Sequence, residues 1–136
     1  MKYKNLIFDT DGTIIESLPD IINAFNKALK ECGHETTFSV EEGKDFIGSG
    51  TKEFTRKAIQ KANLSKEDVK KITPLFAKYY QEMQCDTTRP FDGIVELLEE
   101  LKSKGIKLFI ASNIYLELKA IDILLSHITS IIMADS

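Results

Sequence analysis

The first predicted strand constrains the fold most, because it ends on two acidic residues. The segment NLIFDTDGTIIES, residues 5–17, begins with a run of three consecutive apolar side chains. Such an uninterrupted run is typical of a parallel strand that is covered on both faces. Asp9 and Asp11 follow directly, and Gly12 then breaks the strand. We therefore expect a buried strand over residues 4–9 with two carboxylates at its carboxyl end.

Strand and helix patterns alternate in the second half of the chain. A helix pattern over residues 92–104 precedes a second apolar strand, IKLFIAS, and a further helix pattern precedes a third strand over residues 130–134. This alternation favours an α/β fold with a parallel sheet. Residues 15–85 carry helix patterns only. We therefore expect a core made of residues 1–14 and 86–136, interrupted by a helical cap over residues 15–85.

Several helix boundaries inside the predicted cap carry their own signals. Ser39 precedes a short helix pattern, and Ser65 and Asp68 have the spacing of a capping box. The helix predicted over residues 66–84 contains Pro74, which either bends the helix or divides it in two.

Composition excludes several classes of protein. The net charge is −3 and no basic stretch is present, so we expect no nucleic-acid partner. No apolar stretch approaches the roughly 20 residues that a membrane span needs. Cys32 and Cys85 are too few for a disulfide framework, and they suggest free thiols in a reducing compartment. No signal-peptide pattern is visible, so we expect a cytoplasmic protein.

Polar side chains follow two neighbouring predicted strands. Asp9 and Asp11 follow the first, and Ser112 and Asn113 follow the second. The carboxyl ends of parallel strands form the usual ligand site of an α/β sheet, so these groups should converge. Two close carboxylates repel each other, and a magnesium ion bound by their oxygens relieves that repulsion. The sequence therefore predicts a site for magnesium and a phosphate group.

The same residues suit phosphoryl transfer. One aspartate can attack phosphorus and form an aspartyl-phosphate, while the other exchanges protons with the leaving group and water. Ser112 can donate a hydrogen bond to a phosphate oxygen, and Gly12 allows the backbone to approach the phosphate closely.

Three segments together resemble the haloacid dehalogenase superfamily. FDTDGTI resembles its first motif, LFIASN resembles its second, and RPFDGIVELLEELKSKGIKL resembles the segment that re-enters the core after a helical cap. The pattern is most similar to the branch of phosphoglycolate phosphatases and β-phosphoglucomutases. The resemblance implies an α/β Rossmann-like parallel sheet, here incomplete, with an inserted helical cap.

The resemblance also implies roles for matching residues. Asp9 would be the nucleophile and a magnesium ligand, and Asp11 the general acid and base, with its main-chain carbonyl on the metal. Thr13 would steady the loop and, with Gly12, contribute to phosphate binding. Ser112 would bind the transferring phosphate, and Asn113 would flank it. The turn formed by Gly48, Ser49 and Gly50 would help to select the substrate, although a simple flexible turn is an alternative reading.

These roles predict a magnesium-dependent phosphatase that acts on a small phosphorylated metabolite through an aspartyl-phosphate. The family's third motif supplies a lysine and its fourth supplies further acids, and neither has a match in these 136 residues. Two alternatives therefore stay open: a catalytically weak module that binds an anion or a partner, and a sugar-phosphate mutase. The family's central first strand would also be an edge here, so we expect either that the chain self-associates through this strand or that it is a C-terminally truncated fragment of a longer gene product.

Overall fold

The chain forms two compact units in the computed structural model, which describes residues 3–46, 50–83 and 86–111. Of these, the residues up to Ser17 and from Thr88 onward form one unit, which we call the sheet unit. Leu18–Thr87 form the second, which we call the helical unit. No helix in the described part of the chain is both long and apolar enough to cross a membrane.

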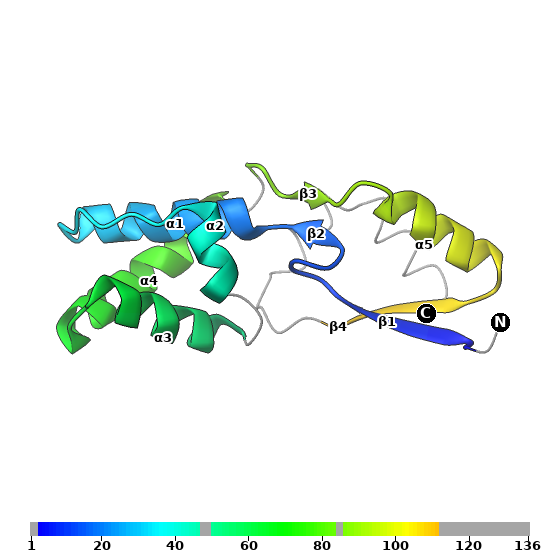
Figure 1. Ribbon diagram of the computed structural model, residues 1–136, viewed down its shortest axis with the longest axis horizontal. Helices are drawn as coiled ribbons and strands as arrows, with labels where there is room; N and C mark the ends of the chain where they lie inside the picture. Colours follow the sequence, from blue (N-terminus) through cyan, green and yellow to red (C-terminus); the bar gives the residue numbers. More distant parts are fainter. Residues whose placement is uncertain (1–2, 47–49, 84–85, 112–136) are drawn as a thin grey trace. The chain divides into compact units, whose positions relative to one another are not determined.

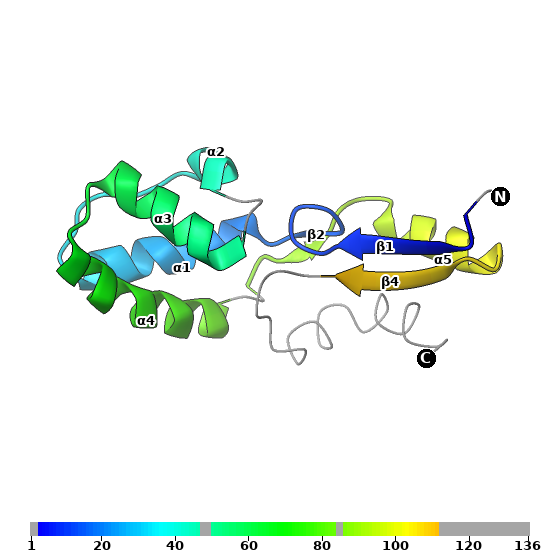
Figure 2. The same ribbon diagram turned by 90° about the horizontal axis from the view of Figure 1, so that it is seen from below.

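The sheet unit is built on two parallel strands. β1 (Asn5–Asp9) pairs with β4 (Lys107–Ala111) (Figure 2). In this register the first residues of the two strands are partners, and so are the last residues. The parallel pairing confirms the α/β class expected from the sequence. Because the register pairs Asp9 with Ala111, both strands end at the same edge of the sheet.

One helix covers one face of this sheet. α5 (Ile94–Ser103) buries Leu98 completely, against a cluster that includes Ile14 and Leu108. Side chains at the alternate strand positions point to the opposite face of the sheet and are exposed. Ile7 is 71% exposed and Phe109 is 48% exposed. The sequence predicted a strand covered on both faces. In the described part of the chain, only the α5 side is covered.

A short antiparallel pair was not predicted. β2 (Ile15–Glu16) pairs with β3 (Arg89–Pro90), and Glu16 also lies 3.8 Å from the guanidinium of Arg89. This pairing holds residues 15–17 in the sheet unit, whereas the sequence placed them with the cap. Two-residue strands carry no alternating pattern, so no periodicity could have revealed them.

The helical unit contains four α-helices and one 3₁₀ turn among the described residues. They are α1 (Leu18–Glu31), α2 (Val40–Gly43), η1 (Lys44–Phe46), α3 (Gly50–Ala62) and α4 (Lys66–Met83). α1 and α4 have the most extensive contact within the unit (Figure 1). The predicted helical cap is therefore confirmed as a set of helices joined by short loops, except that Ile15 and Glu16 form β2.

Aromatic rings form the core of the helical unit. Phe25 is fully buried on α1, and its ring centroid lies 6.0 Å from that of Phe38, 5.6 Å from that of Phe54 and 5.3 Å from that of Phe76. The last two contacts are edge-to-face, a favourable arrangement of the ring quadrupoles. Phe25 thus joins α1 to α3, α4 and the segment before α2.

Two predicted helix starts are confirmed. The Ser39 hydroxyl accepts the Glu42 N–H at 3.2 Å while the Glu42 carboxylate accepts the Ser39 N–H at 2.9 Å, a complete capping box. Ser65 and Asp68 make the same reciprocal pair at 3.1 and 2.9 Å. Pro74 does not divide α4, which runs unbroken through it.

A buried acid closes the helical unit where the chain enters and leaves it. Asp20 is fully buried in the first turn of α1. Its carboxylate accepts the Thr87 N–H at 3.0 Å and the Thr87 hydroxyl at 2.6 Å. A buried carboxylate is tolerated only when its hydrogen bonds are satisfied. These bonds fix the first turn of α1 to the last residue of the unit.

Candidate active site

The loop after β1 is folded around one carbonyl group. The Thr10 carbonyl accepts the N–H groups of Thr13, Ile14 and Ile15 at 3.3, 3.0 and 3.1 Å. Gly12 has a φ of +74°, in the left-handed region that other residues rarely adopt, and its N–H donates to the Ile15 carbonyl at 2.9 Å. Glycine is therefore needed here for its backbone conformation, since nothing lies within 4 Å of an added Cβ.

Asp9 is the accessible acid of this loop. It is the last residue of β1, it is exposed, and its Oδ1 accepts the Thr10 N–H at 2.9 Å. A charge-assisted bond to a backbone N–H holds the carboxylate in one orientation. Asp9 can therefore meet an incoming phosphate group or cation without a change in the fold.

Asp11 is the buried acid, only 8% exposed. Its Oδ1 accepts a short hydrogen bond from the Ser17 hydroxyl, and its Oδ2 has no hydrogen-bond partner among the described residues. Burial is the main cause that raises the pKa of the Asp11 carboxyl above its usual range, and the negative charge of Asp9 adds to it. The hydrogen bond from Ser17 opposes both.

Ser17 also belongs to this site, although the sequence did not predict a role for it there. It is the last residue of the sheet unit, it is 1% exposed, and it lies six positions beyond the acid that it contacts. No periodic pattern links residues at that spacing across an irregular loop. The contact depends on the turn around Thr10, so it could be found only from the folded backbone.

The donor atoms suit a hard cation such as magnesium, whose preferred ligands are oxygens. Asp9 offers an exposed carboxylate, and Asp11, whose main-chain carbonyl is a further oxygen donor, lies two residues away in the same loop. Within residues 3–46, 50–83 and 86–111 no group of three or more His, Cys, Asp or Glu side chains gathers as a metal site would. The loop therefore offers oxygen atoms of the kind that magnesium prefers, and the described residues alone do not complete a metal site.

The structure brings some of the predicted site residues together and leaves others outside its described part. Asp9, Asp11, Gly12 and Thr13 share one loop at the end of β1. The predicted phosphate ligands Ser112 and Asn113 and the predicted cap residues Gly48 and Ser49 lie outside the described residues. Gly50 is the first residue of α3.

Known proteins share this arrangement. The model of the haloacid dehalogenase-like hydrolase family matches residues 6–132. A phosphoglycolate phosphatase from Aquifex aeolicus is 40% identical over 121 residues, which cover 88% of this chain and 54% of that enzyme. Another from Haemophilus influenzae strain 86-028NP is 32% identical over 82% of this chain and 52% of the enzyme.

Solved structures agree. The crystal structure of a predicted phosphoglycolate phosphatase from Haemophilus somnus superposes with a TM-score of 0.82 at 27% identity, covering 91% of this chain and 58% of that one. The chain thus spans about half the length of the curated relatives that it matches. A family match over nearly all of its residues, together with the shared fold, establishes that the chain belongs to the haloacid dehalogenase-like hydrolase family.

Proposed function

We propose that this chain carries the aspartate pair of a magnesium-dependent phosphatase that acts on a small phosphomonoester. One observation carries the proposal: an exposed, oriented carboxylate and a buried carboxyl of raised pKa occupy one loop at the carboxyl end of a parallel strand. The first suits a nucleophile and the second suits a general acid.

Asp9 is the proposed nucleophile. One of its carboxylate oxygens attacks phosphorus, and the bond between phosphorus and the leaving oxygen breaks, which leaves an aspartyl-phosphate. The Thr10 N–H, 2.9 Å from Oδ1, limits rotation of the carboxylate and so favours a single direction of attack.

Asp11 is the proposed acid and base. Burial favours its protonated form, and Ser17 occupies Oδ1, so Oδ2 is the oxygen available to hold the proton. That proton passes to the leaving oxygen in the first step. In the second step the Asp11 carboxylate takes a proton from water as the water attacks phosphorus, and the bond to Asp9 breaks to release phosphate.

Magnesium would be held by the Asp9 carboxylate and by Asp11, and it would neutralise charge on the phosphate group. Gly12 and Thr13 place backbone N–H groups in the same loop. Ser112 and Asn113 remain the proposed further phosphate contacts. This follows from the register, because Ala111, the residue before them, pairs with Asp9.

The relatives suggest which substrate to test first. The two relatives described above are phosphoglycolate phosphatases, so 2-phosphoglycolate is the first candidate substrate. Selection of the substrate by the loop that contains Gly48, Ser49 and Gly50, and a cytoplasmic location, are further parts of the proposal. They rest on the family resemblance and on the composition of the chain.

A chimera tests the proposal independently of chain length. Residues 1–132 of this chain are joined to the remaining C-terminal part of the Aquifex aeolicus enzyme, and hydrolysis of 2-phosphoglycolate is measured with magnesium and with EDTA. We expect magnesium-dependent turnover that Asp9→Asn abolishes, because an amide cannot form the phospho-enzyme. The 136-residue chain is assayed in parallel, and turnover well below that of the chimera would show that the catalytic set needs both halves.

The controls separate failure of chemistry from failure of folding. Thermal melting must show one cooperative transition in the chimera and in its Asp9→Asn variant. A folded chimera without activity would favour a binding module over an enzyme. Activity that survives Asp9→Asn would refute Asp9 as the nucleophile.

We also propose that the 136-residue chain self-associates through β1. Among the described residues β1 pairs only with β4, so its second edge offers unpaired backbone groups beside the exposed Ile7. Light scattering should show dimers or larger species, and Ile7→Lys should reduce them, because edge charges oppose strand pairing. A monodisperse monomer with cooperative melting would contradict this proposal.

A further inference from the structure

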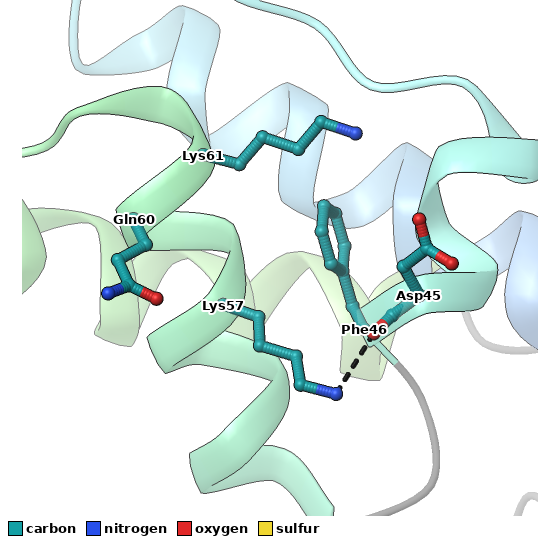
Figure 3. Close-up of a pocket in the computed structure, with 5 residues that line it drawn as sticks. All are labelled: Asp45, Phe46, Lys57, Gln60 and Lys61. Atoms are coloured by element: carbon teal, nitrogen blue, oxygen red, sulfur yellow. Dashed lines mark hydrogen bonds between the residues drawn. The ribbon is translucent and has the colours of Figure 1, made fainter.

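The helical unit has a hollow that the proposed phosphatase chemistry does not use. It has a volume of about 460 Å³, and it is lined by Asp45 and Phe46 from η1 and by Lys57, Gln60 and Lys61 from α3 (Figure 3). All five residues lie within Leu18–Thr87, and none belongs to the loop that carries the aspartates.

Two ammonium groups enter this hollow from one helix. Lys57 and Lys61 are one turn apart on α3, and Figure 3 shows both side chains extending toward η1. Like charges four residues apart on a helix repel each other. An anion placed between them would remove this repulsion.

The two ammonium groups are held by a neutral acceptor and by one exposed ion pair with Glu42. Lys57 Nζ donates to the main-chain carbonyl of Asp45 at 3.0 Å, a neutral acceptor. Lys61 Nζ lies 3.3 Å from Glu42, whereas a strong bond between an ammonium and a carboxylate measures about 2.7–2.9 Å. The Glu42 carboxylate is also engaged by the Ser39 N–H at 2.9 Å. The positive charge in the hollow is therefore only weakly compensated.

The remaining walls limit the kind of anion that fits. The Phe46 ring lies between the two lysine side chains, with Lys61 Nζ 5.6 Å from its centroid (Figure 3). The Phe46 ring itself is only 3% exposed, so the apolar surface of the hollow comes from the methylene groups of the lysines. Asp45 is exposed at the rim, and its carboxylate would repel a second negative charge on the ligand. A single charge on a flat apolar body fits these walls best.

We propose that this hollow binds a small monoanionic carboxylate. Its carboxylate lies between Lys57 Nζ and Lys61 Nζ, and its apolar body lies along the lysine methylenes. Because ion pairs at exposed positions are weak, the affinity is in the millimolar range.

The test is a titration of the isotope-labelled chain followed by NMR, with benzoate as the probe. The signals of Phe46, Lys57 and Lys61 should shift and saturate at millimolar benzoate. Benzamide, which has the same size and no charge, should bind at least several-fold more weakly. Inorganic phosphate, largely a dianion at pH 8, should also shift these signals less than benzoate does. Equal binding of benzamide, or tighter binding of phosphate, would overturn the proposed ligand class.

Substitutions then locate the site. Lys57→Gln and Lys61→Gln should each weaken benzoate binding by about two- to fivefold, the range expected for an exposed ion pair. Lys70→Gln is the matched control, because Lys70 is an exposed lysine of α4 that pairs with Glu67 at 3.2 Å. An effect of Lys70→Gln equal to those of the two hollow lysines would show non-specific attraction and would overturn the site.

Discussion

The aspartate loop of the sheet unit and the helix caps of the helical unit treat their acidic side chains in opposite ways. In the helical unit, hydrogen bonds from Ser65 lower the pKa of Asp68, and hydrogen bonds from Ser39 and Lys61 lower that of Glu42. In the loop after β1, burial raises the pKa of Asp11. A lowered pKa means that folding favours the ionised acid, and a raised one means that folding disfavours it. The helix caps thus gain stability from ionised acids, whereas in the loop folding favours the protonated form of Asp11.

Buried polar atoms show the same contrast. Asp20, in the helical unit, is fully buried and its carboxylate is bonded to Thr87. In the loop, Thr10 Oγ1 and Asp11 Oδ2 are buried with no hydrogen-bond partner among the described residues. An unsatisfied buried polar atom costs about 1–3 kcal/mol, which a bound cation or substrate can recover. Substitutions in the loop should therefore change activity more than stability, and substitutions in the helical unit should do the reverse.

Asp11→Asn should cause the largest change, a loss of activity. Without an acid to protonate the leaving oxygen, turnover of the chimera should fall by about 10²–10⁴-fold. Thermal melting of the 136-residue chain in EDTA should at the same time show higher stability at pH 7, because the substitution removes a buried charge. A loss of both activity and stability would break the contrast between the units.

The stability gained by Asp11→Asn should depend on pH, because the pKa of Asp11 is raised in the folded state. Below the unfolded pKa of about 3.9, Asp11 is protonated in both the folded and the unfolded state, so it costs no stability. As the pH rises, the unfolded chain loses this proton first, and the cost develops until the pH exceeds the raised folded pKa. The advantage of Asp11→Asn should therefore grow above about pH 4 and then level off.

Phe25→Ala should have the largest effect on stability. Its ring contacts those of Phe38, Phe54 and Phe76, and removal of a fully buried phenyl group costs about 3–5 kcal/mol. Melting of the chain should lose its cooperative transition or show a much lower midpoint. Phe91→Ala is the control, because Phe91 is 37% exposed and should change stability much less. Equal effects would mean that the aromatic cluster is not the core of the unit.

The sequence predicted the parts of this molecule that depend on local pattern. The strand that ends in Asp9, the capping pair of Ser65 and Asp68, and the helix over Lys66–Met83 all have signals within a few residues. Their signals suffice because periodicity, caps and strand ends are read from neighbouring positions.

Features that depend on distant segments were not predicted. β2 and β3 are two residues each, and they pair across more than seventy positions of sequence. The bond from Ser17 to Asp11 requires the turn around Thr10, and the burial that raises the pKa of Asp11 requires a packed loop. The sequence thus located the two candidate catalytic acids, while the difference between them, one exposed and one buried, came only from the fold.

Asp20→Ala should cause an intermediate loss of stability. It removes the buried carboxylate that accepts the Thr87 N–H and hydroxyl, and loss of a hydrogen bond to a charged group costs about 1.5–3 kcal/mol of stability. The loss should appear as a lower melting temperature of the chain. Asp20→Asn keeps one acceptor oxygen and should lose less. If both variants melt like the parent chain, the bonds that join the two ends of the helical unit contribute little.

Ser65→Ala should cause the smallest loss of stability. It removes the N-cap of α4, a loss of about 1 kcal/mol, and leaves the aspartate loop and its activity unchanged. Because the pKa of Asp68 is lowered chiefly by Ser65, the stabilisation is present above the unfolded pKa of about 3.9 and is lost as the pH falls through the lower folded value. The difference in melting temperature between Ser65→Ala and the parent chain should therefore be constant from pH 5 to 8. A difference that instead rises and falls with the activity of the chimera would couple the two units and remove the contrast between them.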